Sequence, residues 1–143
     1  MEIISQSEKE TAQAARDFAQ SLSGQAIILL HGDLGMGKSV FCRHLIKALC
    51  NDETLEVPSP TFTLLQQYQY DKGMIWHFDL YRLSDPSEIY EIGWEEALEN
   101  GIILVEWPER LGTLMPRKYT SIDLSCPAKT TPDTRKIEIT HYE

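Results

Sequence analysis

A glycine-rich loop constrains the fold of this chain more than any other part of the sequence: Gly32-Asp33-Leu34-Gly35-Met36-Gly37-Lys38-Ser39. It fits the pattern G-x-x-x-x-G-K-[ST], in which backbone N–H groups surround a triphosphate, the lysine reaches its β and γ phosphates, and the hydroxyl ligates Mg²⁺. Gly32, Gly35 and Gly37 permit backbone angles that a Cβ would forbid, and Lys38 supplies a mobile point charge. The loop therefore predicts a site for nucleotide phosphates.

Both flanks of the loop match the strand and the helix that this motif needs. Ala26-Ile27-Ile28-Leu29-Leu30 is a short apolar run, typical of a strand buried on both faces. After the loop, apolar residues recur at helical spacing: Val40, Phe41, Leu45, Ile46 and Leu49. The N-terminus of such a helix favours the negative charge of bound phosphates.

Length and composition indicate one domain over residues 1–143, with enough apolar residues to bury a core. The longest aliphatic run has five residues and Met1-Glu2 begins no basic, apolar leader, so we expect a soluble, cytoplasmic protein with no membrane contact. Cys42, Cys50 and Cys126 show no C-x-x-C spacing, which argues against a disulfide framework and a zinc site. The net charge of −9 disfavours direct binding of polyphosphate backbones. If the protein serves a nucleic acid, we expect partners to hold it.

The N-terminal segment predicts an amphipathic helix. Ser7 and Glu10 match a capping box, and one apolar face comprises Ala12, Ala15, Phe18, Ala19 and Leu22, ending near Gly24. Thr11 lies in the first turn, and its spacing predicts a solvated position.

Two prolines hold the segment Val57-Pro58-Ser59-Pro60-Thr61-Phe62-Thr63 extended. The segment could present hydroxyls to a γ-phosphate, or it could be a rigid turn entering the next strand. Phe62 to Tyr70 and Met74 to Asp79 are strand-like and flank the turn Asp71-Lys72-Gly73, which predicts an antiparallel hairpin at one side of the sheet.

Two carboxylates end apolar strands, where P-loop proteins place groups that orient water or Mg²⁺. Asp79 ends the second hairpin strand, although it could equally cap the turn before Ser84-Asp85-Pro86. Glu106 ends Ile102-Ile103-Leu104-Val105. The two acids compete for the Mg²⁺ role, and the sequence does not rank them. His77 is interpreted as a structural or partner-contact residue, because no second His or Cys lies at ligand spacing.

The remaining segments complete the predicted fold. Pro86 to Asn100 is helical, broken near Gly93, with inward positions at Trp94, Ala97 and Leu98. Tyr119 to Ser125 and Lys136 to His141 predict two strands. For Arg135 a surface charge is favoured over a contact with a phosphate or a base.

Four motifs now stand in order: the glycine-rich loop, Ser59-Pro60-Thr61-Phe62-Thr63, His77-Phe78-Asp79-Leu80-Tyr81-Arg82-Leu83 and Glu106-Trp107-Pro108-Glu109. This order resembles the bacterial TsaE (YjeE) family, small ATPases required for making threonylcarbamoyladenosine beside the anticodon of tRNAs that read codons beginning with A. The resemblance extends from about Thr11 to Pro116. The chain departs from the common pattern at Met36, where Ala is usual, and at Ser39-Val40, where two Thr are usual.

The resemblance implies ATP and Mg²⁺ as cofactors and a role for each motif residue. The phosphates would be wrapped by Leu34, Gly35, Met36, Gly37, Lys38 and Ser39. Ser39 and Glu106 would bind Mg²⁺, and Asp79 would be an acid needed for hydrolysis. Thr11 would approach the nucleotide, Trp107 would lie beside the site, and Ser59 to Thr63 would sense the γ-phosphate.

The resemblance also implies a fold, partners and a reaction. The fold would be a single P-loop NTPase domain, with a mixed, mainly parallel sheet, helices on both faces and the antiparallel hairpin. A TsaB–TsaD heterodimer would be the partner and would supply the main tRNA-binding surface. Hydrolysis by the free protein should be slow, because no Arg within or beside the loop offers a catalytic finger. The alternatives are a small-molecule kinase and a nucleotide-gated adaptor that does not hydrolyse ATP. A GTP switch is disfavoured because no N-K-x-D motif occurs.

Overall fold

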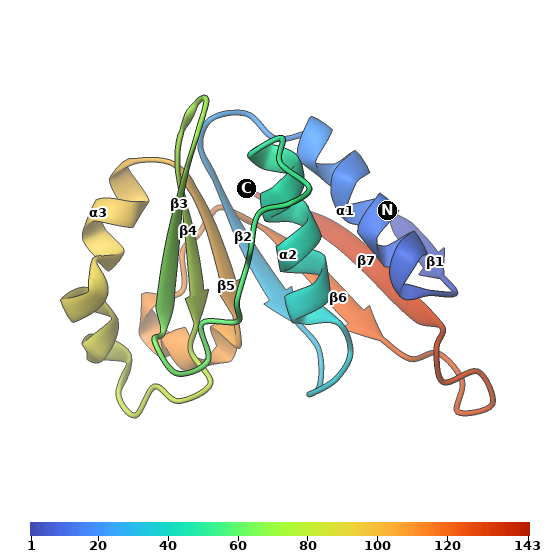
Figure 1. The fold of residues 1–143 in the computed structure, drawn as a ribbon. Helices are drawn as coiled ribbons and strands as arrows, with labels where there is room; N and C mark the ends of the chain where they lie inside the picture. Colours follow the sequence, from blue (N-terminus) through green and yellow to red (C-terminus); the bar gives the residue numbers. More distant parts are fainter.

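The computed structural model describes residues 1–143 and shows a seven-stranded sheet with helices on both faces (Figure 1). The elements, with η for a 3₁₀-helix, are β1 (Glu2–Ser5), α1 (Glu8–Gln20), β2 (Ala26–His31), α2 (Lys38–Leu49), β3 (Leu65–Tyr70), β4 (Gly73–Asp79), η1 (Pro86–Ile92), α3 (Trp94–Glu99), β5 (Ile102–Glu106), η2 (Pro108–Leu114), β6 (Tyr119–Ser125) and β7 (Arg135–Tyr142). The strand order is β1-β7-β6-β2-β5-β4-β3. This confirms the predicted α/β fold.

The four central strands of the sheet, β6, β2, β5 and β4, run parallel. Antiparallel strands flank them on both sides: the predicted β3–β4 hairpin on one side, and β7 with β1 on the other. Register sets Glu106 opposite Leu30 on β2 and opposite Asp79 on β4. Since parallel strands end at the same edge of a sheet, the loop after β2 and both carboxylates meet there.

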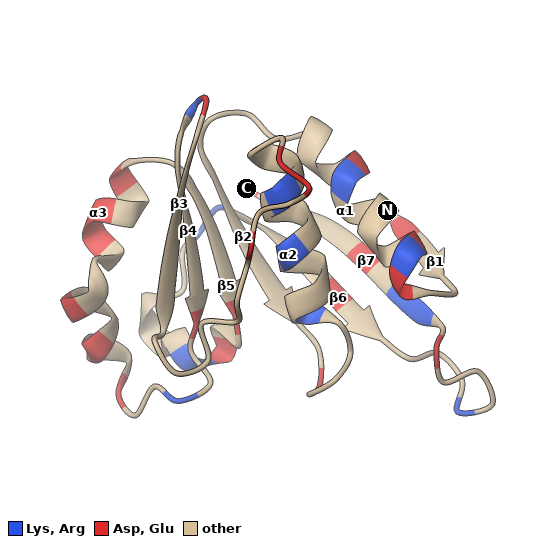
Figure 2. Ribbon diagram, in the orientation of Figure 1, with Lys and Arg blue, Asp and Glu red and all other residues tan.

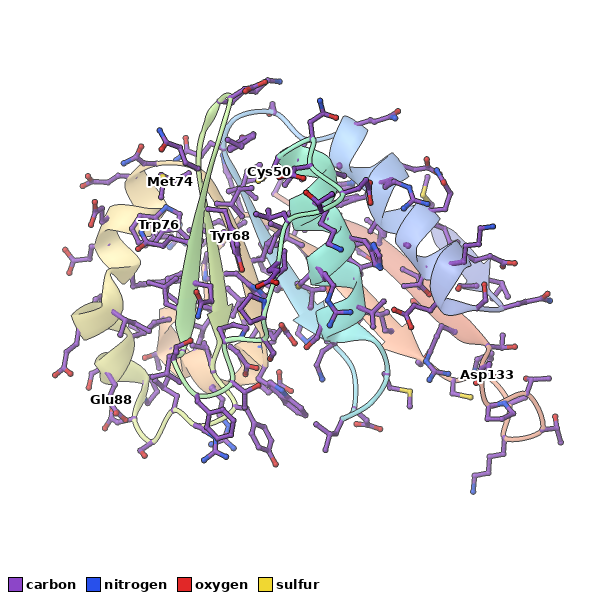
Figure 3. All side chains as sticks on the ribbon, viewed as in Figure 1. Cys50, Tyr68, Met74, Trp76, Glu88 and Asp133 are labelled. Atoms are coloured by element: carbon purple, nitrogen blue, oxygen red, sulfur yellow. The ribbon has the colours of Figure 1, made fainter.

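Helices close the sheet on each face and create two hydrophobic cores (Figure 1). In the core on the side of α1 and α2, the ring centres of Phe18 on α1 and Phe41 on α2 lie 6.2 Å apart. Under η1 and α3, Trp94 meets Phe78 edge to face at 5.4 Å, and Trp76 packs in the same core (Figure 3). Each of these buried rings contributes about 1.5–3 kcal/mol of burial free energy, so both layers anchor the sheet.

Strand β5 lies at the centre of the fold and is buried along its whole length. Ile102 and Leu104 belong to the core under α1 and α2, whereas Ile103 and Val105 belong to the opposite core. Its continuous apolar run is typical of a parallel strand covered on both faces. The run therefore carries Glu106 into the interior, where that side chain is 2% exposed.

The helical segment from Pro86 to Asn100 differs in detail from the prediction. Its first half is the 3₁₀-helix η1, and the expected break is Gly93, which adopts a left-handed φ of 98°. Trp94 and Ala97 are buried as predicted, but Leu98 is exposed. Leu98 lies one turn after Trp94 and next to the end of the short helix at Glu99, where 38% of the residue stays exposed.

Two further differences concern the strands. The first hairpin strand begins at Leu65 rather than Phe62, because the N–H of Leu64 closes a turn onto the carbonyl of Pro60 and Leu64 adopts a φ of 67°. Strand β1 was not predicted, and it pairs with β7 at the sheet edge. None of the helices combines the length and apolar character that crossing a membrane requires.

Candidate functional site

The glycine-rich loop joins β2 to α2, as its pattern predicts. A Cβ at Gly32 would lie 2.7 Å from the carbonyl oxygen of Leu124 on β6, so close backbone packing requires glycine there. Gly37, the N-cap of α2, has a φ of 103°, in the left-handed region that favours glycine. The helix therefore starts immediately after the loop, with its free N–H groups at the loop's C-terminal end.

A pocket of about 290 Å³ opens beside the loop and gathers residues from four segments. Lys38 and Ser39 come from the start of α2, Asp79 from the end of β4, and Glu106 with Trp107 from the end of β5. Thr61 and Tyr81 complete its wall, and Leu34, 76% exposed, lies at its rim. The structure thus brings together candidates that are far apart in the sequence.

Glu106 is the centre of a buried hydrogen-bond chain. The Ser39 hydroxyl donates to Glu106 Oε1 at 2.9 Å, and His77 Nε2 lies 2.7 Å from Glu106 Oε2. His77 and Glu106 are 1% and 2% exposed. The structure therefore separates the two competing acids, because only Glu106 contacts Ser39. His77 holds that carboxylate, which agrees with a structural role.

Cys42 approaches the same cluster, and the ligand atoms of Cys42, His77 and Glu106 all lie within 4.8 Å of one another. Spacing along the sequence concealed this cluster, since its members come from α2, β4 and β5. Burial raises the pKa of the Cys42 thiol well above its usual value, and the charges of Glu106 and Asp79 add to the effect. The thiol is therefore protonated at neutral pH.

Asp79 connects the pocket with the proline-bracketed loop. Its Oδ2 accepts from the Thr61 hydroxyl at 3.1 Å, and its Oδ1 accepts from the Tyr81 N–H at 3.0 Å. Thr61 in turn pairs with the Ser59 hydroxyl at 2.7 Å. Burial raises the pKa of Asp79, although the two hydrogen bonds that its carboxylate accepts, from Tyr81 and Thr61, oppose that rise. Asp79 therefore both caps the turn after β4 and lines the pocket.

Lys38 reaches across the pocket to Trp107. Its ammonium donates to the carbonyl of Gly32 and lies 3.6 Å from the centre of the Trp107 ring. Burial lowers the pKa of Lys38, opposed by several carboxylates, of which Glu106 has the largest effect. Trp107 adopts left-handed angles of 59° and 51°, which turn the chain sharply after β5. Its indole is 4.9 Å from the ring of Tyr81, so aromatic groups form one wall of the site.

A second cavity, of about 360 Å³, adjoins the first across the loop. Gly35, Gly37 and Val40 line both cavities, and Thr11 and Arg135 line only the second. The prediction of a solvated Thr11 was wrong: the residue is 4% exposed and its hydroxyl lies 2.7 Å from that of Ser5. Ser5 belongs to β1, the strand that the sequence did not reveal, so nothing indicated this contact.

Arg135 also lies elsewhere than predicted. Its Nε–H donates to the carbonyl of Met36 at 3.1 Å, and an Nη2–H donates to the carbonyl of Gly35 at 3.4 Å. Arg135 is therefore not a free surface charge, and an Arg does stand beside the loop. The sequence offered no signal for this contact, because pairing of β7 with β6 places the residue there.

The comparisons with known proteins agree with this geometry. A model of the family described as "Threonylcarbamoyl adenosine biosynthesis protein TsaE" matches residues 5–137. The chain is 47% identical over 122 residues to the tRNA threonylcarbamoyladenosine biosynthesis protein TsaE of Rickettsia felis, covering 85% of this chain and 71% of that protein. It is 43% identical over 109 residues to the protein of the same name from Aquifex aeolicus, covering 76% and 77%. The crystal structure of Bacillus subtilis YdiB has a TM-score of 0.78 at 23% identity, covering 100% of this chain and 86% of that one, which shows a shared fold.

Proposed function

The chain belongs to the TsaE family, which acts in tRNA threonylcarbamoyladenosine biosynthesis, and from this membership we propose that it is a P-loop ATPase of that pathway. It hydrolyses Mg-ATP, and hydrolysis drives the cycling of a TsaB–TsaD transferase complex. The modified nucleoside lies beside the anticodon of tRNAs that read codons beginning with A. The protein works in the cytoplasm, where those tRNAs are modified.

One observation carries the proposal for the chemistry. Lys38, Ser39, Asp79 and Glu106 line a single pocket at the edge where the parallel strands end. A cation, a hydroxyl and two carboxylates around a phosphate loop form the set of groups that phosphoryl transfer to water uses. This is also the cavity that holds the lysine and the serine of the G-x-x-x-x-G-K-[ST] pattern, Lys38 and Ser39.

The donor atoms around Ser39 fit Mg²⁺, which prefers oxygen ligands. The Ser39 hydroxyl gives its hydrogen to Glu106, so its oxygen keeps lone pairs for a cation. The Glu106 carboxylate supplies negative charge at the same place. Ser39 and Glu106 would hold the ion, and bound Mg²⁺ would neutralise charge on the β and γ phosphates.

The remaining residues support an in-line attack of water on the γ-phosphate. The loop N–H groups and Lys38 stabilise the negative charge that develops on the phosphate oxygens. The lowered pKa of Lys38 reflects burial, and the carboxylates around the ammonium oppose that effect and favour its charged form. Asp79, ionised, accepts a hydrogen bond from the attacking water and orients it. The Thr61 contact to Asp79 ties the Ser59 to Thr63 loop to the γ-phosphate position.

The nucleoside is proposed to extend into the second cavity. That cavity shares Gly35 and Gly37 with the phosphate pocket and is walled by Thr11. The direction agrees with the expectation that the N-terminal helix approaches the nucleotide.

The partner proposal rests on charge as well as on family membership. With a net charge of −9, the chain is a poor ligand for tRNA, so TsaB and TsaD would hold the tRNA. Turnover by the free chain is slow, because Arg135 donates to loop carbonyls instead of pointing into the phosphate pocket. A partner then completes the catalytic site.

The proposal is tested by measuring ATP hydrolysis by the chain alone and with TsaB–TsaD. Lys38→Ala and Glu106→Ala are compared with Lys72→Ala and Glu95→Ala, which remove exposed charges from the hairpin turn and α3. We expect slow hydrolysis that rises with the partners and falls about a hundredfold in the first two variants only.

Other results would redirect the assignment. Absence of ATP binding would contradict the nucleotide site itself. A Glu106→Gln variant that loses hydrolysis but retains ATP binding, partner binding and tRNA modification would establish the adaptor instead. Transfer of phosphate to a metabolite rather than to water would establish the kinase.

A further inference from the structure

Arg135 makes contacts to the phosphate loop for which the proposed reaction gives no reason. It is the first residue of β7, and its guanidinium reaches the carbonyls of Gly35 and Met36, about 100 residues away in sequence. On the other side its Nη1 donates to the carbonyls of Pro132 at 2.6 Å and Thr134 at 3.0 Å. All of its hydrogen bonds go to backbone carbonyls.

No carboxylate neutralises this guanidinium. The ion pairs of the chain join His77 to Glu106, and Lys136 to Glu2 and Glu138. Asp133, labelled in Figure 3 on the loop before β7, lines the same cavity as Arg135 without pairing with it. The charge of Arg135 is therefore directed at carbonyl dipoles, and a planar fork can engage two of them at once.

The two carbonyls belong to peptide groups whose N–H ends face the other way. All peptide bonds of the chain are trans, so C=O and N–H of one group point in opposite directions. The Met36 carbonyl shares its peptide group with the Gly37 N–H. The Gly35 carbonyl shares its group with the Met36 N–H, which donates to the Asp33 carbonyl at 3.1 Å. Fixing the Met36 carbonyl on Arg135 thus turns the Gly37 N–H away from the guanidinium.

The loop needs such a clamp because glycine gives it little stiffness of its own. Gly35 and Gly37 adopt φ values of 83° and 103°, and glycine loses more conformational freedom on ordering than any other residue. A cradle that is already ordered binds its ligand more tightly, because the ordering entropy is not lost at binding.

We propose that Arg135 is a positioning residue of the phosphate site, whose guanidinium clamps the Gly35 and Met36 carbonyls and so presents the Gly37 N–H to the phosphates. The inference rests on the proposed nucleotide site and adds a residue from the C-terminal strand to it. Arg135 acts through the loop backbone and does not contact the reacting atoms.

Calorimetric titration with Mg-ATP and with inorganic tripolyphosphate tests the clamp. The proteins are the wild type, Arg135→Gln, Arg135→Lys and, as a matched control, Arg117→Gln, which removes an exposed guanidinium at the start of the segment leading to β6. We expect Arg135→Gln to weaken both ligands about tenfold, because the clamp acts on the phosphate cradle. Lysine should restore only part of the affinity, since one ammonium does not span both carbonyls as a fork does.

Amide hydrogen exchange provides a readout that does not depend on ligand binding. In Arg135→Gln we expect the Met36 amide, which donates to the Asp33 carbonyl, to exchange about tenfold faster, while the core amides of β5 stay as in the wild type. If the glutamine variant does not fold, Arg135→Lys carries the same comparison.

Several outcomes would overturn the inference. Weaker ATP binding with unchanged tripolyphosphate binding would mean that Arg135 contacts the nucleoside directly. Full recovery by lysine would mean that charge alone suffices, and equal affinities in all variants would mean that the contacts are incidental. If the wild type binds neither ligand, the proposed nucleotide site fails first and the inference fails with it.

Discussion

At the scale of single residues, the Glu106 carboxylate is held at both oxygens: Oε1 accepts from the Ser39 hydroxyl, and Oε2 pairs with His77 Nε2. A glutamine has the same shape but carries no negative charge and has only one accepting oxygen, so it is a poorer ligand for Mg²⁺. We expect Glu106→Gln to raise the Mg²⁺ concentration for half-maximal hydrolysis at least about tenfold. A Mg²⁺ titration of ATP hydrolysis measures this. Glu109→Gln, an exposed neighbour, is the control, and an unchanged Mg²⁺ requirement in Glu106→Gln would contradict the assignment.

Asp79 makes stability depend on pH. Burial raises the pKa of Asp79 in the native state above the ordinary 3.8. At pH values between 3.8 and the native-state pKa, the native state therefore binds more protons than the unfolded state. Stability therefore falls as pH rises through that window, and Asp79→Asn should remove the loss. Each unit of the shift corresponds to about 1.4 kcal/mol. Urea unfolding at about pH 4 and about pH 7 should show the advantage of the variant over the wild type growing with pH. The exposed Asp71→Asn control should show no such trend, and an advantage independent of pH would argue against a buried charge.

The site residues that the sequence identified lie in local patterns, whereas those it missed owe their positions to strand pairing. Lys38 and Ser39 share one motif, and Asp79 and Glu106 each end an apolar strand, so local pattern was sufficient. Thr11 was assigned to the site only by family resemblance, because its position depends on a strand that pairs across the sheet.

At the element scale, the turn before β5 depends on Gly101. It has a φ of 100°, and a Cβ there would lie 2.2 Å from the Met74 carbonyl oxygen on β4. We expect Gly101→Ala to destabilise the protein by about 3 kcal/mol, from the left-handed backbone together with displacement of β4. Gly24→Ala is the control, since its Cβ would meet nothing within 4 Å and its φ is not positive, and its effect should stay within about 1 kcal/mol. Urea midpoints compare the two. Equal midpoints would show that β4 yields easily at this turn.

Element types were more predictable than element ends. The buried strands β2 and β5 and the helix α2 followed from unbroken apolar runs and helical spacing. Strand β1 was missed because Glu2–Ser5 is a short edge segment whose sequence, Glu-Ile-Ile-Ser, does not alternate polar with apolar residues. The start of β3 was displaced because a left-handed Leu64 ends the turn, and no residue type announces that conformation.

Charge is distributed unevenly over the whole molecule. Figure 2 shows Asp and Glu along η1 and α3, Lys and Arg on α2, and residues of both signs on α1. Burial lowers the pKa of His44, and the nearby charges of Lys47, Arg43 and Arg16 lower it further. Three cations and the carboxylate of Glu8 thus lie near one imidazole on the α1–α2 face. This cluster could attract an anionic backbone.

The proposal that TsaB and TsaD hold the tRNA requires that this cluster does not bind tRNA by itself. Each phosphate contact contributes a salt-dependent gain, but three cations against a net charge of −9 leave the long-range field repulsive. We expect filter binding at about 0.15 M salt to show no retention of tRNA by the chain alone, and retention once TsaB–TsaD is added. The triple variant Arg16→Gln, Arg43→Gln, Lys47→Gln should leave retention by the complex unchanged. Retention of tRNA by the chain alone, abolished in the triple variant, would contradict the proposal that TsaB and TsaD hold the tRNA. It would make the α1–α2 face an RNA contact.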